Sequence, residues 1–289
     1  PQIWKRTESF YGQNFIWCYL GNFGGMTEIE GDFHQNEAWL RETMENAGPG
    51  FVGIGSTLEG FGVNEPVYEA VMAQAWDTGI SLDSYIDNIA DRHLGRADAN
   101  YRAFWHKLAD EVSVSHPYTG SATVINAHPT LTGKWHWTTD IRKGYDISKA
   151  VEALELISKV EGESNYLDYD RVNIHRQVIG NCAAAVRDRF TDCYRRGDRD
   201  GMLKAKAEFL ELCDSLTSVL STRREFSLQD WIDDARRWGI TEEQKDYYEM
   251  NARTLISVWG DSFHLCDYAN RDWDGLVDTY YKPRWEMFF

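Results

Sequence analysis

Positive charge and long apolar runs are both scarce in this chain of 289 residues. It has 30 Lys and Arg residues against 46 Asp and Glu residues, for a net charge of −16. Binding to nucleic acid needs a concentrated positive field, so this composition argues against such a partner. No stretch approaches the roughly 18 uncharged apolar residues of a membrane span, and no basic segment followed by an apolar one opens the chain. We therefore expect neither nucleic acid nor a membrane as a partner.

Cysteine is also sparse, and no CxxC pair or metal-type spacing occurs. The odd number of five argues against a disulfide framework and predicts mostly buried thiols. Among the eight histidines, His116, His128 and His136 are too widely spaced for a metal-binding pair. We expect no metal ion and no cofactor. The five cysteines are Cys18, Cys182, Cys193, Cys213 and Cys266.

Two further absences bear on origin. No N-x-S/T acceptor is present, which disfavours a glycosylated eukaryotic product and favours a bacterial one. The chain starts at Pro1 without a methionine, as expected for a piece of a longer protein.

Aromatic residues, in contrast, are abundant at 14%, including 12 Trp. This excess suits surfaces that stack on sugars, nucleobases or cofactors, although aromatic helix cores are an equal alternative.

The first part of the chain has the pattern of an α/β fold. Apolar runs over residues 14–20 and 50–55 predict two short strands buried on both faces. Between them, "AWLRETMENAGPG" predicts a helix over residues 39–47 that ends at a Gly-Pro-Gly turn. Strand, helix and strand in this order form a parallel unit.

From Pro66 onward the pattern is helical. "TEEQ", with Thr241 and Gln244 at capping-box spacing, predicts another helix start, and a last helix is expected over residues 273–281. We place a domain boundary near residue 80. Two apolar stripes at helical spacing are expected to be core faces: Ile147, Val151, Leu154, Ile157 and Val160, and Phe209, Leu212, Leu216, Val219 and Leu220.

Glu59 stands out because it follows a predicted strand and precedes a predicted helix, in "GIGSTLEGFGVNEPVYEA". Loops at the carboxyl ends of parallel strands carry the active sites of α/β folds, so Glu59 is a candidate catalytic carboxylate. A solvated loop glutamate is the alternative. The same stretch lacks the third glycine of a dinucleotide loop, the Lys-Ser/Thr of a P-loop and the spacing of a serine-hydrolase elbow.

Glycoside hydrolysis would need a second carboxylate, about 5 Å from the first for retention or about 6.5 to 9.5 Å from it for inversion. Glu28, Glu30 and Asp32 in "TEIEGDF" follow the first strand's loop and are candidates, although an exposed acidic run is the favoured interpretation. Glu65 is expected at a helix start.

Three segments together resemble a known family. "FIWCYLGNFGG", "GSTLEGFGVNEPVYE" and "SVWGDSFHLCDYANRDWDGLVDTYYKPRW" are similar, in order and spacing, to signatures of the α-N-acetylglucosaminidases of glycoside hydrolase family 89. The third is the most specific. Its matching residues are Trp259, Gly260, Asp267, Tyr268, Ala269, Asn270, Trp273, Gly275, Leu276, Tyr280, Tyr281, Arg284 and Trp285.

The resemblance implies a fold class of α/β plus all-α: the last strands of a (β/α)8 barrel over residues 1–80, then an all-helical C-terminal domain over residues 81–289. It implies a retaining exo-glycosidase that removes terminal α-linked N-acetylglucosamine from glycans. Glu59 matches the nucleophile. The acid/base glutamate lies on an earlier strand, before Pro1, so the chain alone is expected to be nearly inert and to need an upstream half of the same enzyme.

The resemblance also implies sugar contacts near the first strand. Trp17 and Cys18 would line the pocket, and Asn22 would hydrogen-bond a hydroxyl or the acetamido group. Asn64 is a further expected contact. Gly21 stands where relatives usually have His, which puts a sugar contact at that position in doubt. A purely structural role for Trp17 and Cys18 is the alternative.

In the helical part, the resemblance places Asp267, Tyr268 and Trp273 at the pocket mouth. Arg284 and Trp285 are expected to pack the domain. Two other functions stay open: a non-catalytic glycan-binding or assembly module, and a helical protein-interaction scaffold. Secretion or periplasmic export is expected only because of the resemblance.

Overall fold

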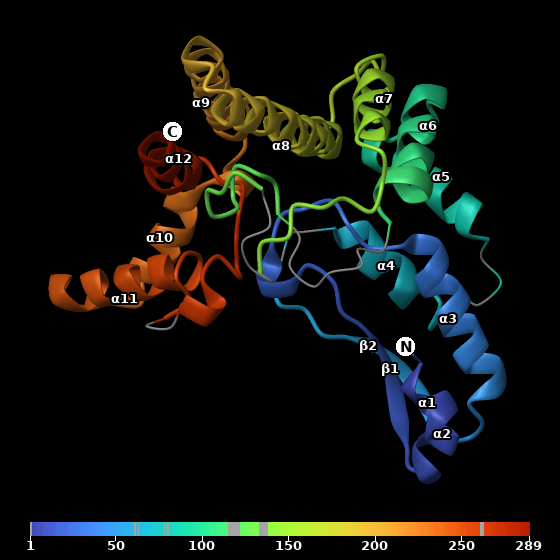
Figure 1. Ribbon diagram of the computed structural model, residues 1–289. Coiled ribbons are helices and arrows are strands. Elements are labelled where there is room, and N and C mark those ends of the chain that lie inside the picture. Colours follow the sequence, from blue (N-terminus) through green and yellow to red (C-terminus); the bar gives the residue numbers. More distant parts are fainter. Residues whose placement is uncertain are drawn as a thin grey trace. The chain divides into compact units, whose positions relative to one another are not determined.

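The computed structural model describes residues 2–60, 62, 64–77, 79, 81–114, 122–132, 138–260 and 263–289. The chain forms two compact units, drawn in Figure 1. The first, here called the α/β unit, comprises residues 1–22, 29–116 and 144–167. The second, the helical unit, comprises residues 23–28, 117–143 and 168–289.

The α/β unit contains the strand–helix–strand arrangement that the sequence predicts. Strand β1 (Phe15–Tyr19) pairs in parallel with β2 (Phe51–Ser56), and α3 (Phe33–Asn46) connects them. Helix α4 (Glu65–Ala73) follows β2 and begins at Glu65, as predicted. The other elements of the unit are α1 (Ile3–Arg6), α2 (Glu8–Tyr11), α5 (Leu82–Leu94), α6 (Ala99–Lys107), η2 (Leu108–Val112) and α7 (Ser148–Ile157).

The prediction that both strands are buried on both faces is wrong. Side chains alternate along β1, and Ile16 is 55% exposed while Val52 of β2 is 58% exposed. Tyr19 lies on the covered side, where its ring meets the Tyr68 ring of α4 edge-on at 4.6 Å between centroids. An apolar run indicates that a strand can be buried, but neighbouring elements decide whether each face is covered.

Helix α3 begins six residues before its predicted start. Asp32 caps it, because its side chain accepts a hydrogen bond from the backbone N–H of Gln35 at 2.8 Å. A side-chain acceptor at this position satisfies an N–H group that has no partner inside the helix. The cap, rather than the apolar spacing, therefore sets the start of α3.

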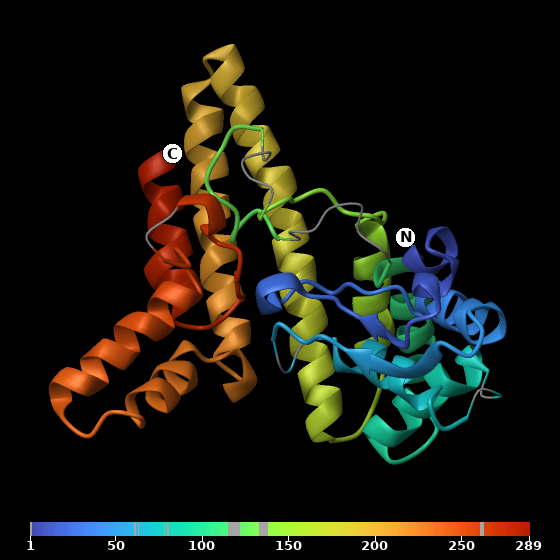
Figure 2. The ribbon, with the colours of Figure 1, turned by 90° about the horizontal axis from the view of Figure 1, so that it is seen from below.

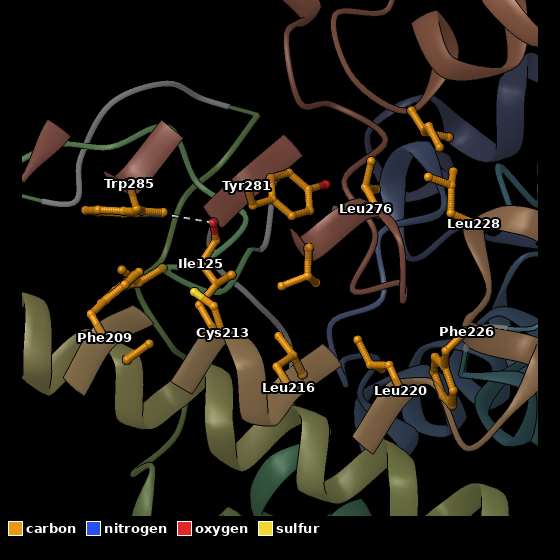
Figure 3. Close-up of a cluster of buried hydrophobic side chains, with 14 of the residues drawn as sticks. Ile125, Phe209, Cys213, Leu216, Leu220, Phe226, Leu228, Leu276, Tyr281 and Trp285 are labelled. Carbon is orange, nitrogen blue, oxygen red and sulfur yellow. Dashed lines mark hydrogen bonds between the residues drawn. The ribbon is translucent and has the colours of Figure 1, made fainter. Parts of the chain in front are cut away.

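The helical unit is built on two long helices that run side by side in Figures 1 and 2, α8 (Asn165–Arg196) and α9 (Arg199–Leu220). Its core is shown in Figure 3. The predicted apolar face of α9 is confirmed, since Phe209, Leu216 and Leu220 are buried there. The remaining elements are η1 (Phe23–Gly25), η3 (Arg224–Phe226), α10 (Leu228–Arg236), α11 (Glu242–Leu255), η4 (Phe263–Leu265), η5 (Val277–Tyr281) and α12 (Lys282–Phe288).

The stripe predicted for α7 is only partly right. Ile157 is buried, but Ile147 and Val151 are exposed, and Ala150 and Ala153 take their place in the core. Small residues let a neighbouring helix approach closely, and α7 packs against α6 on this face. Alanine contributes little to an apolar pattern, so the prediction chose the larger residues Ile147 and Val151 as the core face instead.

The chain ends around a buried tryptophan. The helix predicted over residues 273–281 is displaced toward the C-terminus: η5 begins at Val277 and continues into α12. Trp285 of α12 packs on Phe209 and donates its indole N–H to the Ile125 carbonyl at 3.1 Å (Figure 3). The last turns of the chain therefore close the core of the helical unit.

All five cysteines are free thiols, and the expectation that most are buried is wrong. Cys193 and Cys213 are buried, Cys266 is half-buried, and Cys18 and Cys182 are exposed.

Three features of the sequence concern metals and membranes. His116 and His136 lie outside the described residues. Within the described ranges, no cluster of three or more His, Cys, Asp or Glu side chains is placed to hold a metal ion. No helix in the same part of the chain has the length and apolarity to cross a membrane.

Candidate active site

Glu59 lies where the sequence places it, three residues beyond the end of β2 and six before the start of α4. Its side chain is exposed to solvent. The segment between β2 and α4, residues 57–64, is here called the Glu59 loop, and of these residues the structure describes 57–60, 62 and 64. A solvated carboxylate at a strand end can act as a nucleophile toward a sugar that reaches it.

The start of the Glu59 loop is hydrogen-bonded to β1. The backbone N–H of Thr57 donates to the carbonyl of Tyr19 at 3.0 Å. This bond continues the parallel pairing of Tyr19 with Ser56, the last residue of β2. The loop therefore departs from a fixed point on the neighbouring strand.

The end of the loop meets Asn22, which is fully buried. The Asn64 carboxamide donates from Nδ2 to the Oδ1 atom of Asn22 at 2.9 Å. Both residues have left-handed backbones, with φ of 51° at Asn22 and 48° at Asn64. Asparagine tolerates this region better than most residues because its short polar side chain can bond locally. The structure thus brings together two of the predicted substrate contacts.

The backbone of Asn22 is hydrogen-bonded to a buried glutamate. Its backbone N–H donates to Oε1 of Glu30 at 2.6 Å. The Glu30 side chain is only 6% exposed, and the hydroxyl of Ser113 donates to the Glu30 carbonyl at 3.0 Å. A bond from an N–H to a carboxylate is about twice as strong as one between neutral groups.

Tyr68 of α4 joins the same cluster. Its hydroxyl donates to the carbonyl of Gly21 at 2.9 Å and accepts from the N–H of Gly21 at 3.1 Å. Burial raises the pKa of Tyr68, and the charges of Glu30 and Glu59 raise it further, whereas the bond to Gly21 lowers it. The phenol therefore stays neutral and keeps the proton that it donates.

Gly21 lies against the side chain of Tyr19. A Cβ atom at this position would lie 2.4 Å from the hydroxyl oxygen of Tyr19, closer than real Cβ contacts allow. The Tyr19 phenol therefore occupies the space that a side chain at position 21 would need. Glycine at position 21 leaves the Tyr19 side chain in place, whereas a histidine, which the resemblance leads us to expect, would need it to move.

Trp17 and Cys18 lie on β1, opposite Ile54 and Gly55 of β2. Trp17 is half-buried and Cys18 is exposed. Their contact with a sugar stays a prediction. Because the Cys18 thiol is exposed, a ligand can reach it.

The acidic segment after β1 is not an exposed run. Glu28 is 2% exposed, and its carboxylate pairs with Nζ of Lys143 at 2.8 Å and accepts from Nε2 of Gln177 at 2.7 Å. Glu30 holds Asn22, and Asp32 caps α3. Each of the three carboxylates therefore has a structural role. A buried charge is costly unless it is paired, and the pairing is visible only in three dimensions.

In the helical unit, Asp267 is buried and both of its carboxylate oxygens are engaged. Oδ2 pairs with Arg284 at 2.7 Å, and Oδ1 accepts from the Tyr280 hydroxyl at 3.0 Å. Arg284 also donates to the carbonyl of Asn126 at 2.9 Å. Asp267 therefore anchors α12, and the sugar contact expected for it stays a prediction.

Tyr268 and Trp273 are half-buried aromatic residues of the same unit. The Tyr268 ring meets Trp259 edge-on at 5.1 Å, and the Trp273 ring lies 6.0 Å from Trp231. Tyr268 also faces the first signature segment, since a Cβ on Gly24 would lie 2.5 Å from the Tyr268 carbonyl oxygen. Two of the three signature segments thus meet inside the helical unit.

Sequence reasoning named Glu30 only as a candidate second carboxylate and missed its bond to Asn22, and it did not name Tyr68 at all. Glu30 belongs to an acidic segment with ordinary loop composition, so no local pattern distinguishes it from a solvated residue. Tyr68 lies on the first turn of α4, and its hydroxyl bonds Gly21, two residues beyond β1. The one available signal for Tyr68 was its place in the segment that also carries Glu59.

Comparison with known proteins matches both parts of the chain to one family. Residues 1–78 match the α-N-acetylglucosaminidase (NAGLU) TIM-barrel domain, and residues 85–289 match the α-N-acetylglucosaminidase (NAGLU) C-terminal domain. Human α-N-acetylglucosaminidase is 28% identical over 99% of this chain, which covers 39% of the human protein.

Two solved structures from Clostridium perfringens are similar. A family 89 glycoside hydrolase in complex with PUGNAc has a TM-score of 0.91 and 29% identity, covering 99% of this chain and 34% of its own. A variant with two glutamates replaced by glutamine, in complex with its substrate GlcNAc-α-1,4-galactose, has a TM-score of 0.90 and 29% identity, covering 98% of this chain and 33% of its own.

The chain thus spans between about a third and two fifths of the length of these relatives. Both domain matches carry signature segments that were identified in the sequence, and the second covers more than half of the chain. The chain belongs to the α-N-acetylglucosaminidase family of glycoside hydrolases, family 89, and corresponds to the end of its TIM barrel and its C-terminal domain.

Proposed function

We propose that this chain is the C-terminal part of a retaining exo-glycosidase that removes terminal α-linked N-acetylglucosamine from glycans. Residues 1–80 would be the end of the barrel, and residues 81–289 the helical domain. The observation that carries the proposal is the position of Glu59: an exposed carboxylate in the loop after β2, within a chain that matches both domains of the family.

In the proposed reaction, the Glu59 carboxylate attacks the anomeric carbon and forms a glycosyl-enzyme, which water then hydrolyses. A second carboxyl group must protonate the leaving oxygen. Glu28, Glu30 and Asp32 are already engaged in the structure, which favours an acid/base supplied by the segment upstream. That segment is the partner that we propose, with a glycan bearing terminal N-acetylglucosamine as the substrate.

The relatives support the choice of sugar. The Clostridium perfringens enzyme has GlcNAc-α-1,4-galactose as its substrate, and its bound variant has two glutamates replaced. Two replaced glutamates suit a mechanism with two carboxyl groups. The proposed sugar contacts come from both units. Those in the α/β unit are Trp17, Cys18, Asn22 and Asn64. Those in the helical unit are Asp267, Tyr268 and Trp273. Export to the periplasm or the medium, and a bacterial source, stay predictions of the sequence.

The test is hydrolysis of a chromogenic α-N-acetylglucosaminide by the chain alone and by the chain together with its upstream segment. We expect activity only when both are present. Proton NMR should then detect the α-anomer of the sugar first, as retention requires. A β-anomer would contradict the proposed mechanism.

Replacement of the nucleophile provides the second test. Glu59→Gln should lower kcat/KM by at least about 10³-fold, because the amide cannot form the glycosyl-enzyme. Glu65→Gln is the matched control: this exposed residue begins α4 and should change kcat/KM less than about threefold. An active Glu59→Gln enzyme would instead favour a glycan-binding or assembly module.

A further inference from the structure

We infer that Asn22, Tyr68 and Glu30 are positioning residues that hold both ends of the Glu59 loop against the end of β1. The catalytic part of this inference rests on the proposed function, whereas the structural part does not. None of the three needs to touch the sugar. They act on Glu59 indirectly, because they fix the backbone positions at the ends of the loop that carries it.

Both ends of the Glu59 loop are attached to one short stretch of chain, residues 19–22. At the start, Thr57 donates from its N–H to the Tyr19 carbonyl at 3.0 Å. At the end, Asn64 donates to the side chain of Asn22 at 2.9 Å. Two described residues at the ends of the loop, Thr57 and Asn64, are thus bonded to the same neighbouring stretch, which restricts where Glu59 can point.

Tyr68 adds a second attachment beyond the loop end. Its hydroxyl bonds both the N–H and the C=O of Gly21, so one side chain fixes the peptide groups on both sides of that residue. Tyr68 lies on the first turn of α4, directly after the loop. It therefore couples the start of α4 to the end of β1.

Glu30 sets the orientation of Asn22. The backbone of Asn22 is in the left-handed region, with φ of 51°, and its N–H points at the buried Glu30 carboxylate at 2.6 Å. Without this acceptor the N–H would be buried and unpaired, which favours another backbone conformation. Asn22 would then no longer present Oδ1 to Asn64.

Tyr19 provides a matched control within the same cluster. Its ring contacts that of Tyr68, and its hydroxyl is also buried, but among the described residues this hydroxyl has no hydrogen-bond partner. Tyr19→Phe and Tyr68→Phe remove the same atom from adjacent rings. Only the second removes hydrogen bonds.

The first measurement is hydrogen–deuterium exchange of the chain, followed by mass spectrometry of peptides that cover residues 57–64. We expect exchange in this loop to accelerate about tenfold or more in Tyr68→Phe and to stay within about twofold of wild type in Tyr19→Phe. Equal rates in the two variants would overturn the inference. Asn64→Ala, which leaves the core intact, serves if Tyr68→Phe does not fold, and the same acceleration is expected.

The second measurement is the kinetics of the chain together with its upstream segment. Tyr68→Phe should lower kcat about 10- to 100-fold with KM changed less than about threefold, because a misplaced nucleophile impairs the chemical step more than binding. Glu30→Gln retains an acceptor oxygen and should keep more activity than Glu30→Ala. If kcat of Tyr68→Phe equals that of Tyr19→Phe, the positioning role is wrong. An inactive wild-type pair would contradict the proposed function alone, since exchange still tests the attachment.

Discussion

Two buried charges in the helical unit show how single residues hold the segment after β1. Arg176 and Asp272 are both fully buried, and Nη1 of Arg176 lies 2.6 Å from Oδ2 of Asp272. The backbone N–H of Asp272 donates to the Thr27 hydroxyl at 2.8 Å. Removal of one partner would leave an uncompensated charge, which costs far more than an exposed pair contributes.

Asp272→Asn should therefore lower the free energy of unfolding by about 3 to 5 kcal/mol, as measured by urea denaturation. Glu208→Gln is the control. Its partner Arg189 is more than half exposed, so the change should be at most about 1 kcal/mol. Similar losses in the two variants would show that burial of the pair does not determine its contribution.

Thiol reactivity should separate the cysteines by burial. Cys18 and Cys182 are exposed and should react with a disulfide reagent at pH 8 before Cys213 does. Burial raises the pKa of Cys213 from 9.0 to about 12, so its neutral thiol is favoured by folding. That stability is complete below pH about 9 and is lost as the pH rises toward about 12. Rapid labelling of Cys213 in the folded chain, identified by mass spectrometry, would contradict this.

At the scale of elements, the success of each prediction depended on whether the local pattern carries the decisive information. The parallel pair of strands and the capping box of α11 were predictable because turn residues and caps act locally. The α9 face was predictable because large apolar residues repeat along it. The α7 face was not, since alanines form it, and the open face of β1 was not, because coverage depends on other elements.

For the candidate site too, the residues with a local sequence signal could be predicted and those that depend on distant partners could not. The position of Glu59 between β2 and α4 could be predicted because a carboxylate between a strand and a helix is a local signal. Glu30 and Tyr68 could not, because their roles depend on partners 8 and 47 residues away in the sequence. No periodicity or motif spacing encodes such pairings.

The capping box of α11 gives a prediction at this scale. Thr241 accepts from the Gln244 N–H, and the Gln244 side chain accepts from the Thr241 N–H at 3.2 Å. Thr241→Ala should lower the free energy of unfolding by about 1 kcal/mol, whereas Thr241→Ser keeps the hydroxyl and should change it little. Thermal unfolding monitored by circular dichroism measures both. Equal stability of the Ala and Ser variants would show that the cap contributes nothing.

At the scale of the whole molecule, the open face of the two-stranded sheet is the surface that the proposed upstream segment would cover. Ile16 of β1 and Val52 of β2 are both exposed, although isolated sheets of two strands are marginal in water. Burial of such side chains contributes about 25 cal/mol for each Å² of apolar area. The exposed face therefore favours association with further strands.

The double variant Ile16→Ser, Val52→Ser should weaken binding of the upstream segment at least about tenfold, measured by isothermal titration calorimetry. Ile240→Ser is the matched control. Ile240 is 88% exposed and lies between α10 and α11, so its replacement should leave the affinity unchanged. If both variants bind as wild type does, the sheet face is not the interface.

The position of residues 23–28 in the helical unit limits where this protein can be divided into domains. The family domains meet between residues 78 and 85, yet this hexapeptide from the first domain belongs to the compact helical unit. A gene cut at residue 80 would deprive Lys143 of Glu28, and it would leave the Asp272 N–H without the hydroxyl of Thr27. The helical domain, residues 81–289, is therefore poorly suited to expression or fusion without residues 23–28. Recombination between relatives should yield folded protein more often when residues 23–28 and the helical domain come from the same parent.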